Sequence, residues 1–148
     1  MFYLDTSVLI AALTPEPASE AVLDWLAAQE AGSLSISGWV STEVSSALAM
    51  KVRTKALTLA KRAQVLTAYH RLVEESLTVE PVSVRHFETA ARFVDQHDLG
   101  MRAGDALHLA IASERGLTLA TLDRRLADVG PKLGAATLFM ETVHEQRQ

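Results

Sequence analysis

Short apolar segments of strand length alternate with longer segments of helical periodicity along almost the whole chain. This alternation is typical of a parallel sheet, because each crossover between parallel strands needs room for a helix. The four prolines fall at or near the ends of these segments, where chain breakers belong. Strands are expected at residues 2–5, 34–37, 78–82, 117–120 and 135–139. Helices are expected at residues 7–13, 18–31, 41–52, 57–75, 84–97, 104–115 and 123–129.

The helix expected at residues 104–115 is apolar on nearly all sides, with His108 as its one polar residue between Ala106 and Ala112. Such a helix is buried on several sides. We therefore expect an α/β protein with a three-layer α/β/α sandwich and a mostly parallel central sheet. His108 is expected to be a packed core residue rather than a ligand. Pro81 falls inside the third expected strand, which places that strand at an edge of the sheet.

Length and composition exclude several classes of protein. A chain of 148 residues is expected to form a single domain, residues 1–148. Cysteine is absent, which excludes a disulfide framework, a thiol nucleophile and cysteine-ligated metals. No apolar run reaches about 18 residues, so no membrane span is expected. Without a signal peptide at its start, the chain is expected to work in the cytoplasm.

Four acidic residues occupy suggestive positions. Asp5 ends the first expected strand and Asp123 follows the fourth, and sites form at the carboxyl ends of strands in an open parallel sheet. Glu43 and Asp105 each fall in the first turn of an expected helix. Taken singly, each acid also has a structural explanation as a helix cap or as a favourable charge at a helix N-terminus.

Convergence of these acids would require a counter-charge. Two carboxylates about 4 Å apart repel each other by roughly 4 kcal/mol at an effective dielectric constant near 20. Oxygen ligands favour a hard cation such as Mg²⁺ or Mn²⁺. Such ions support phosphoryl transfer, because they lower the pKa of a bound water and stabilise charge on the phosphate.

The motifs around the four acids resemble the PIN domain family in order and spacing. In length the chain is most similar to VapC-type ribonuclease toxins of toxin–antitoxin pairs. The motifs are Asp5-Thr6-Ser7, Ser41-Thr42-Glu43-Val44, Asp105-Ala106-Leu107-His108-Leu109-Ala110 and Thr121-Leu122-Asp123.

The resemblance implies a divalent-metal-dependent endoribonuclease on a five-stranded parallel sheet. It implies that Mg²⁺ or Mn²⁺ binds to Asp5, Glu43 and Asp105, with Asp123 as a fourth acid. It also implies that hydroxyl groups of Thr6 or Ser7 and of Thr121 support the site through hydrogen bonds. The expected partners are an RNA substrate, a second copy of the chain in a homodimer, and a cognate antitoxin whose tail covers the site.

Two other functions remain open. The first is a non-catalytic module on the same fold that binds RNA or a protein, in which the acids serve only as caps. A phosphatase acting on small molecules is disfavoured, because it needs an Asp-x-Asp arrangement and Ser7 stands at the second acidic position. A nucleotide-binding fold is disfavoured further by the lack of a glycine-rich phosphate loop.

The charges are unevenly distributed along the chain. The formal net charge of -4 alone disfavours a nucleic-acid partner, but residues 1–43 contain no base and residues 44–73 contain six bases and no acid. The basic segment is either a solvated helix face, a surface that follows RNA phosphates, or a docking surface for an acidic antitoxin. Apolar faces of the helices within residues 7–31 and 41–75 are expected to accept an antitoxin helix or a second copy of the chain. Arg102, three residues before Asp105, is a candidate to hold a carboxylate or a phosphate.

Overall fold

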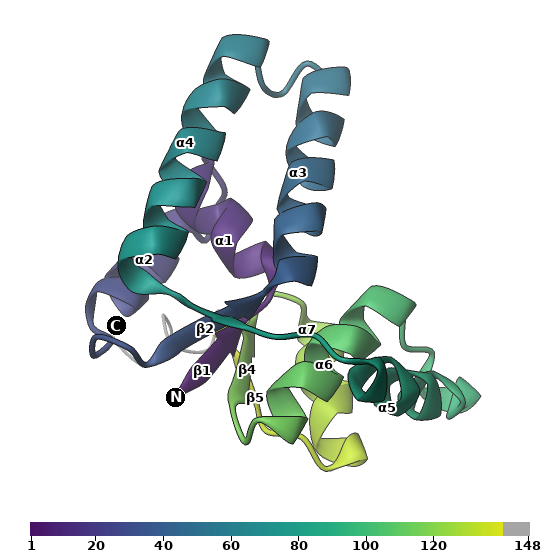
Figure 1. The fold of residues 1–148 in the computed structure, drawn as a ribbon. Helices are drawn as coiled ribbons and strands as arrows, with labels where there is room; N and C mark the ends of the chain where they lie inside the picture. Colours follow the sequence, from purple (N-terminus) through teal and green to yellow (C-terminus); the bar gives the residue numbers. More distant parts are fainter. Residues whose placement is uncertain (141–148) are drawn as a thin grey trace.

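A five-stranded, wholly parallel sheet forms the centre of the computed structural model, which describes residues 1–140 (Figure 1). The strand order is β3-β2-β1-β4-β5, so β1 is the central strand and β3 and β5 are the edges. The expected fold class is confirmed. The strands are β1 (Phe2–Leu4), β2 (Leu34–Ser37), β3 (Thr78–Glu80), β4 (Thr118–Thr121) and β5 (Thr137–Phe139).

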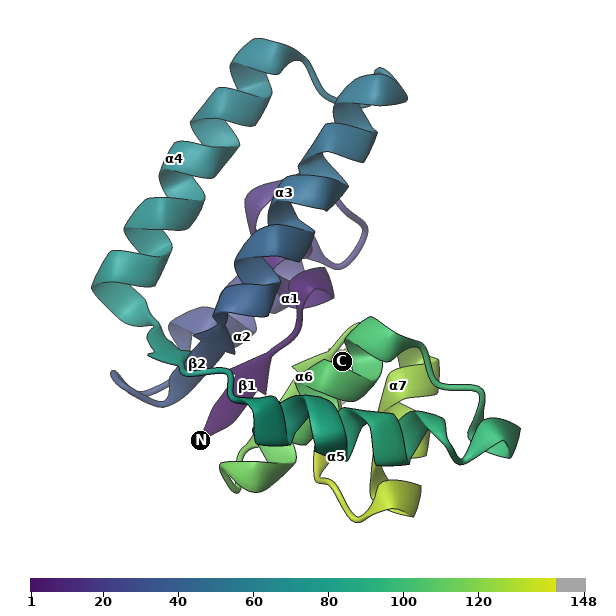
Figure 2. The ribbon, with the colours of Figure 1, turned by 45° about the vertical axis from the view of Figure 1, so that its right-hand side comes forward.

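Helices cover the sheet in two layers (Figures 1 and 2). Right-handed crossovers place the first four helices over one face and the last three over the other, because the strand order runs outward from β1 first in one direction and then in the other. The first layer contains α1 (Thr6–Leu13), α2 (Ser19–Ala27), α3 (Gly38–Arg53) and α4 (Leu59–Ser76). The second contains α5 (Val84–Val94), α6 (Ala103–Glu114) and α7 (Arg124–Val129), with short 3₁₀ turns η1 (His97–Leu99) and η2 (Gly130–Leu133).

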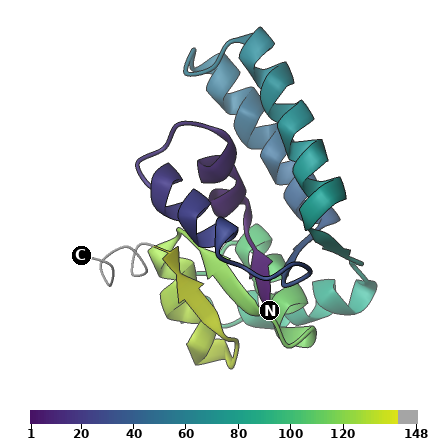
Figure 3. The same cartoon turned by 90° about the vertical axis from the view of Figure 1, so that its left-hand side faces the viewer.

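The helix α6 is the most deeply buried helix segment, as its composition predicts. Every residue from Ala106 to Ala112 is buried, and α6 packs against α5 and β4. His108 is 2% exposed, so it is a core residue as expected. In the opposite layer, α3 and α4 form an antiparallel hairpin that extends away from the sheet (Figures 1 and 3).

The connections reverse direction between β1 and β4, the two neighbouring strands at the centre of the sheet. From β1 the chain proceeds to β2 and β3 on one side, and it then returns to β4 and β5 on the other. The crevice at the carboxyl ends of two such strands is where ligands bind in open α/β sheets. Asp5 directly follows β1, and Asp123 lies two residues after β4.

Several expected boundaries are wrong, and one of them matters for function. The third helix begins at Gly38 rather than at residue 41, so Glu43 lies in its second turn and not its first. The explanation of Glu43 as a charge that favours the helix N-terminus therefore fails, because that effect fades within the first turn. The fifth helix ends at Val94 rather than at residue 97, and η1 is a separate turn.

Two further boundaries shift around turn residues. The second helix ends at Ala27, before the turn that contains Gly32 with a φ of 78°. The strand β3 ends at Glu80, so Pro81 follows it, and the expectation of an edge strand is confirmed. No helix within residues 1–140 combines the length and apolar character needed to cross a bilayer.

We expect Leu109→Ala, which truncates a fully buried side chain of α6, to lower the free energy of unfolding by about 2–5 kcal/mol. Leu23→Ala is the matched control, because Leu23 lies on α2 and is 50% exposed, and its cost should stay below about 1 kcal/mol. Urea unfolding measures both. Equal costs would contradict the placement of α6 between the sheet and α5.

Candidate active site

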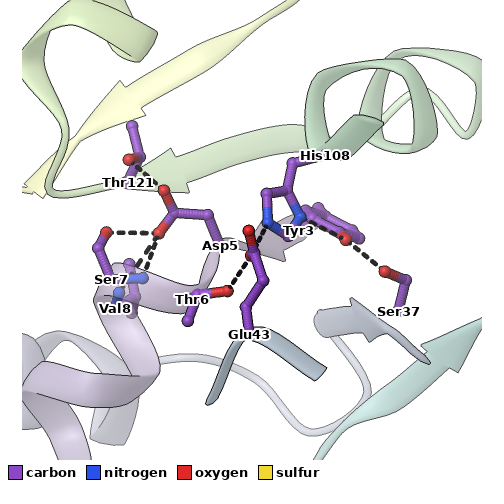
Figure 4. A network of polar contacts seen from close by, with 9 residues as sticks. All are labelled: Tyr3, Asp5, Thr6, Ser7, Val8, Ser37, Glu43, His108 and Thr121. Carbon is purple, nitrogen blue, oxygen red and sulfur yellow. Dashed lines mark hydrogen bonds and ion pairs between the residues drawn. The ribbon is translucent and has the colours of Figure 1, made fainter. Parts of the chain in front are cut away.

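Asp5 is a buried carboxylate at the carboxyl end of β1, and it caps the N-terminus of α1 (Figure 4). Its Oδ1 accepts hydrogen bonds from the Ser7 amide at 3.0 Å, the Ser7 hydroxyl at 2.5 Å and the Val8 amide at 3.3 Å. Its Oδ2 accepts a hydrogen bond from Thr121 Oγ1 at 2.5 Å. Burial raises the pKa of Asp5, and these hydrogen bonds offset only part of that rise.

Ser7 and Thr121 also join the turn after β1 to the turn after β4. The Thr121 hydroxyl accepts a hydrogen bond from the Asp123 amide at 2.9 Å, and the Ser7 hydroxyl accepts one from the Leu122 amide at 3.0 Å. Ser7 therefore donates to Asp5 in its own turn and accepts from the turn after β4, whereas Thr121 donates across to Asp5 and accepts from Asp123 in its own turn. These hydrogen bonds hold Asp5 and Asp123, which follow the neighbouring strands β1 and β4, at fixed positions relative to each other.

Glu43 extends from α3 towards the same edge of the sheet (Figure 4). Its Oε2 accepts hydrogen bonds from Thr6 Oγ1 and from His108 Nε2, both at 2.5 Å. Burial by itself would raise the pKa of Glu43. The hydrogen bond and charge of His108, together with Thr6 and Trp39, outweigh burial and lower the pKa below its ordinary value.

A chain of polar groups continues from His108 into the core. His108 Nδ1 lies 3.0 Å from the Tyr3 hydroxyl, which in turn lies 2.7 Å from Ser37 Oγ. When His108 is neutral and donates from Nε2 to Glu43, its Nδ1 accepts a hydrogen bond from the Tyr3 hydroxyl, and when the ring is protonated Nδ1 donates instead. Burial raises the pKa of Tyr3, which keeps that proton in place.

The sequence gives no motif for Tyr3 or Ser37, and neither was expected at the site. His108 gives one sequence signal that a hydrogen-bond partner such as Tyr3 lies nearby. A polar ring on an otherwise apolar, buried helix needs a hydrogen-bond partner, because an unsatisfied buried polar group is costly. The expectation of core packing was correct, but that packing also holds the carboxylate of Glu43.

Asp105 and Asp123 line one pocket of about 150 Å³ beside the first two acids. Asp123 caps α7, and its Oδ1 accepts from the Leu126 amide at 3.1 Å. The carboxylate of Asp105, within the first turn of α6, accepts no hydrogen bond from any other residue in the range 1–140. Its pKa is raised first by burial and then by the negative charge of Asp123, with smaller contributions from Asp5 and Glu43.

The four acids therefore lie within electrostatic range of one another at the expected edge of the sheet. Among residues 1–140, no three carboxylate or imidazole side chains lie close enough to hold a metal ion as they stand. The donor set nevertheless fits a hard divalent cation in its chemistry, since it consists of carboxylate oxygens and includes an acid whose ionisation is opposed by its neighbours. Metal ligation by these residues stays a prediction.

Charge pairing changes the interpretation of the basic segment. Lys51 Nζ lies 2.6 Å from Glu16 Oε1, and Arg71 Nε lies 2.9 Å from Glu75 Oε1. Both partners lie outside residues 44–73, so two of the six bases are not available as isolated charges. The exposed bases near the tip of the α3–α4 hairpin are Arg53, Lys55 and Lys61.

The PIN domain family model matches residues 2–132, so this chain belongs to the PIN domain family. No curated protein matches it in sequence. Solved structures with the same fold include FitAcB from Neisseria gonorrhoeae, which is 22% identical with a TM-score of 0.68, and the match covers 95% of this chain and 99% of that chain.

Two further structures show the same fold. VapC20 from Mycobacterium tuberculosis, described as a sarcin–ricin loop cleaving toxin, is 20% identical with a TM-score of 0.69, over 88% of this chain and 95% of that chain. VapBC2 from Rickettsia felis, bound to a promoter DNA fragment, is 16% identical with a TM-score of 0.66, over 94% of this chain and 98% of that chain. The structures with this fold thus include a protein described as a toxin and one described as bound to promoter DNA.

We expect Asp105→Asn to raise the melting temperature of the metal-free protein at pH 7. A carboxylate with a raised pKa destabilises the folded state above that pKa, and the penalty disappears as the pH falls towards the ordinary value of 3.8. The gain should therefore shrink on acidification. Thermal melts in a chelator, repeated from neutral to acidic pH, measure it.

The same variant should lose stabilisation by Mn²⁺. For the unmodified chain we expect a gain of about 2.7 kcal/mol at a Mn²⁺ concentration about 100 times the dissociation constant. Asp98→Asn is the matched control, because Asp98 is an exposed acid of η1. If Mn²⁺ stabilised Asp105→Asn as strongly as Asp98→Asn, Asp105 would not be a ligand.

Tyr3→Phe should cost about 1–3 kcal/mol of stability, because it leaves His108 Nδ1 and Ser37 Oγ without a buried partner. It should also weaken Mn²⁺ binding by about tenfold or more, since the support of Glu43 is loosened. Tyr69→Phe is the control, because it removes a hydrogen bond of 2.7 Å between the buried Tyr69 and the partly buried Ser41. Calorimetry should show unchanged Mn²⁺ affinity for Tyr69→Phe; an equal loss in both variants would argue against a specific role of Tyr3.

Proposed function

We propose that this chain, as a single PIN-like domain, is a divalent-metal-dependent endoribonuclease and the toxin component of a toxin–antitoxin pair. The observation that carries the proposal is the gathering of four acids, from four distant parts of the sequence, at the point where the sheet reverses its strand order. Membership of the PIN domain family and the structural likeness to toxins of this class support it.

In this proposal Mg²⁺ or Mn²⁺ is held by Asp5, Glu43 and Asp105, with Asp123 as a fourth acid. When bound, the ion supplies a water of lowered pKa and stabilises negative charge on the phosphate. The residues of the chain hold the acids in place. Thr6 and His108 orient Glu43, whereas Ser7 and Thr121 orient Asp5 and lower the cost of its ionised form.

The proposed reaction is hydrolysis of an RNA phosphodiester by in-line attack of water, which leaves a 3′-hydroxyl and a 5′-phosphate. No histidine acts as the general base in this scheme. His108 is unsuited to that role, because both of its ring nitrogens are engaged with Tyr3 and Glu43 and the ring is buried.

We further propose a cognate antitoxin and a homodimer as partners. Apolar surface beside the site supports this. A pocket of about 390 Å³ lies between α5, α6 and Trp39, and its rim includes the exposed Phe87 and Val94. The exposed Leu23, Met50 and Leu59 lie on the helices of the other layer, where an antitoxin helix is expected to dock.

The second candidate is a non-catalytic binding module. The hydrogen bonds that occupy both oxygens of Asp5 favour it, because they show that this acid has a structural role as a cap. Calorimetry with Mn²⁺ separates the two functions. A nuclease of the proposed kind binds the ion, and a module whose acids are only caps does not.

We expect the purified protein to cleave structured RNA in the presence of Mg²⁺ or Mn²⁺, and we expect cleavage to stop in excess chelator. Asp5→Asn and Asp105→Asn should reduce cleavage to background, whereas Asp98→Asn should leave it unchanged. Gel analysis of end-labelled transcripts measures the products and their ends. Cleavage that continues in chelator, or that survives both substitutions, would contradict the proposed function.

A further inference from the structure

The pocket that contains Asp105 and Asp123 is bordered by two arginines. Its volume of about 150 Å³ is several times the roughly 30 Å³ that one water molecule occupies in the liquid. The turn between η1 and α6 forms one side and the first turns of α7 form the other. Its lining includes Gly100, Arg102, Asp105, Asp123 and Arg125.

Arg125 is fixed across this pocket by the backbone of Gly100. Its Nη2 donates to the Gly100 carbonyl oxygen at 2.7 Å. Gly100 has a φ of 59°, and a Cβ at this position would lie 2.2 Å from Nη2. Only glycine therefore allows the guanidinium to lie here, and the contact joins the loop before α6 to the start of α7.

Arg102 and Arg125 both have N–H groups that donate no hydrogen bond to a described residue. A guanidinium has five N–H donors in a rigid plane, and Arg125 uses one of them for Gly100. Arg102 is exposed and makes neither a hydrogen bond nor an ion pair through its side chain within the part of the chain that the structure describes. Neither is paired with Asp105 or Asp123, although all four residues line the same pocket.

We propose that Arg102 and Arg125 bind a backbone phosphate of the RNA, next to the phosphodiester that is cleaved. This rests on the proposed function and extends it to a subsite. Planar guanidinium groups match the geometry of phosphate oxygens, so the pair suits a phosphate better than a neutral base edge.

The two acids make this subsite conditional. Asp105 and Asp123 repel an anion in the same pocket while their charges are uncompensated. A divalent cation on the acids removes that repulsion. The arginines should therefore contribute to RNA affinity when the cation is present and contribute little without it.

The test is fluorescence anisotropy with a fluorescein-labelled RNA hairpin, in Ca²⁺ and separately in EDTA. In Ca²⁺, Arg102→Gln and Arg125→Gln should each raise the dissociation constant by about tenfold and reduce the salt dependence of log K by about 1. Lys132→Gln is the control, because it removes the same charge from an exposed position of η2 outside the pocket. It should change the affinity less than about twofold.

Gly100→Ala provides a probe that changes no charge. The added Cβ displaces the Arg125 guanidinium, so the variant should lose RNA affinity in Ca²⁺ much as Arg125→Gln does. A thermal melt checks that it folds. Losses of equal size in Ca²⁺ and in EDTA, or losses no larger than that of Lys132→Gln, would overturn the proposal.

Kinetics separate failure of the subsite from failure of the proposed function. If the unmodified protein cleaves RNA, the arginine variants should raise KM by about tenfold and change kcat by less than about threefold, because a flanking phosphate is bound equally before and during the reaction. Cleavage with unchanged KM and unchanged affinity in both variants would refute the subsite alone. Absence of cleavage by the unmodified protein would refute the proposed nuclease activity. The anisotropy measurements would still show whether Arg102 and Arg125 bind an RNA phosphate.

Discussion

The arrangement at this edge of the sheet depends on how the buried carboxylate of Asp5 is solvated. An ionised carboxylate without water needs hydrogen-bond donors from the protein, or its desolvation cost is prohibitive. Here the donors come from the first turn of α1 and from Thr121 at the end of β4. Because these donors belong to segments more than a hundred residues apart, satisfying one acid also fixes the two central strands and the turns that follow them.

The four acids divide into two kinds. Asp5 and Glu43 accept short hydrogen bonds from hydroxyl groups and an imidazole, and of these donors Thr121 and His108 are buried in the core. Asp105 receives none from residues 1–140, and Asp123 retains one oxygen beyond its capping contact. The side chains of Asp5 and Glu43 are therefore held in position by the protein before any cation binds. Asp105 and Asp123 face the pocket, where the repulsion between their carboxylates is relieved only by a proton or a cation.

The sequence was sufficient to locate the strands and to single out the four acids, because both follow from local patterns. Strands buried on both faces read as short apolar runs, and acids at their ends stand out against them. The sequence predicts the ends of the helices less accurately. Glu43 was placed in the wrong turn because Ser41 is a good capping residue, whereas the helix actually begins directly after β2 at Gly38. Contacts between distant segments, such as His108 with Tyr3 or Arg125 with Gly100, have no local signature and needed the fold.

The charge distribution can now be understood through the fold. Asp5 and Glu43 belong to the acid-only segment, but Asp5 is buried, Glu43 is partly buried and hydrogen-bonded to His108, and Glu16 is paired with Lys51. The basic segment follows on the α3–α4 hairpin, which begins at the carboxyl end of β2 and extends away from the sheet (Figure 2). Its exposed bases lie in the first helix layer, and Arg102 and Arg125 line the same pocket as Asp105 and Asp123. A chain with a net charge of -4 thus presents exposed positive charge at two separate places, and a polyanion is attracted to both while the acidic centre requires a cation.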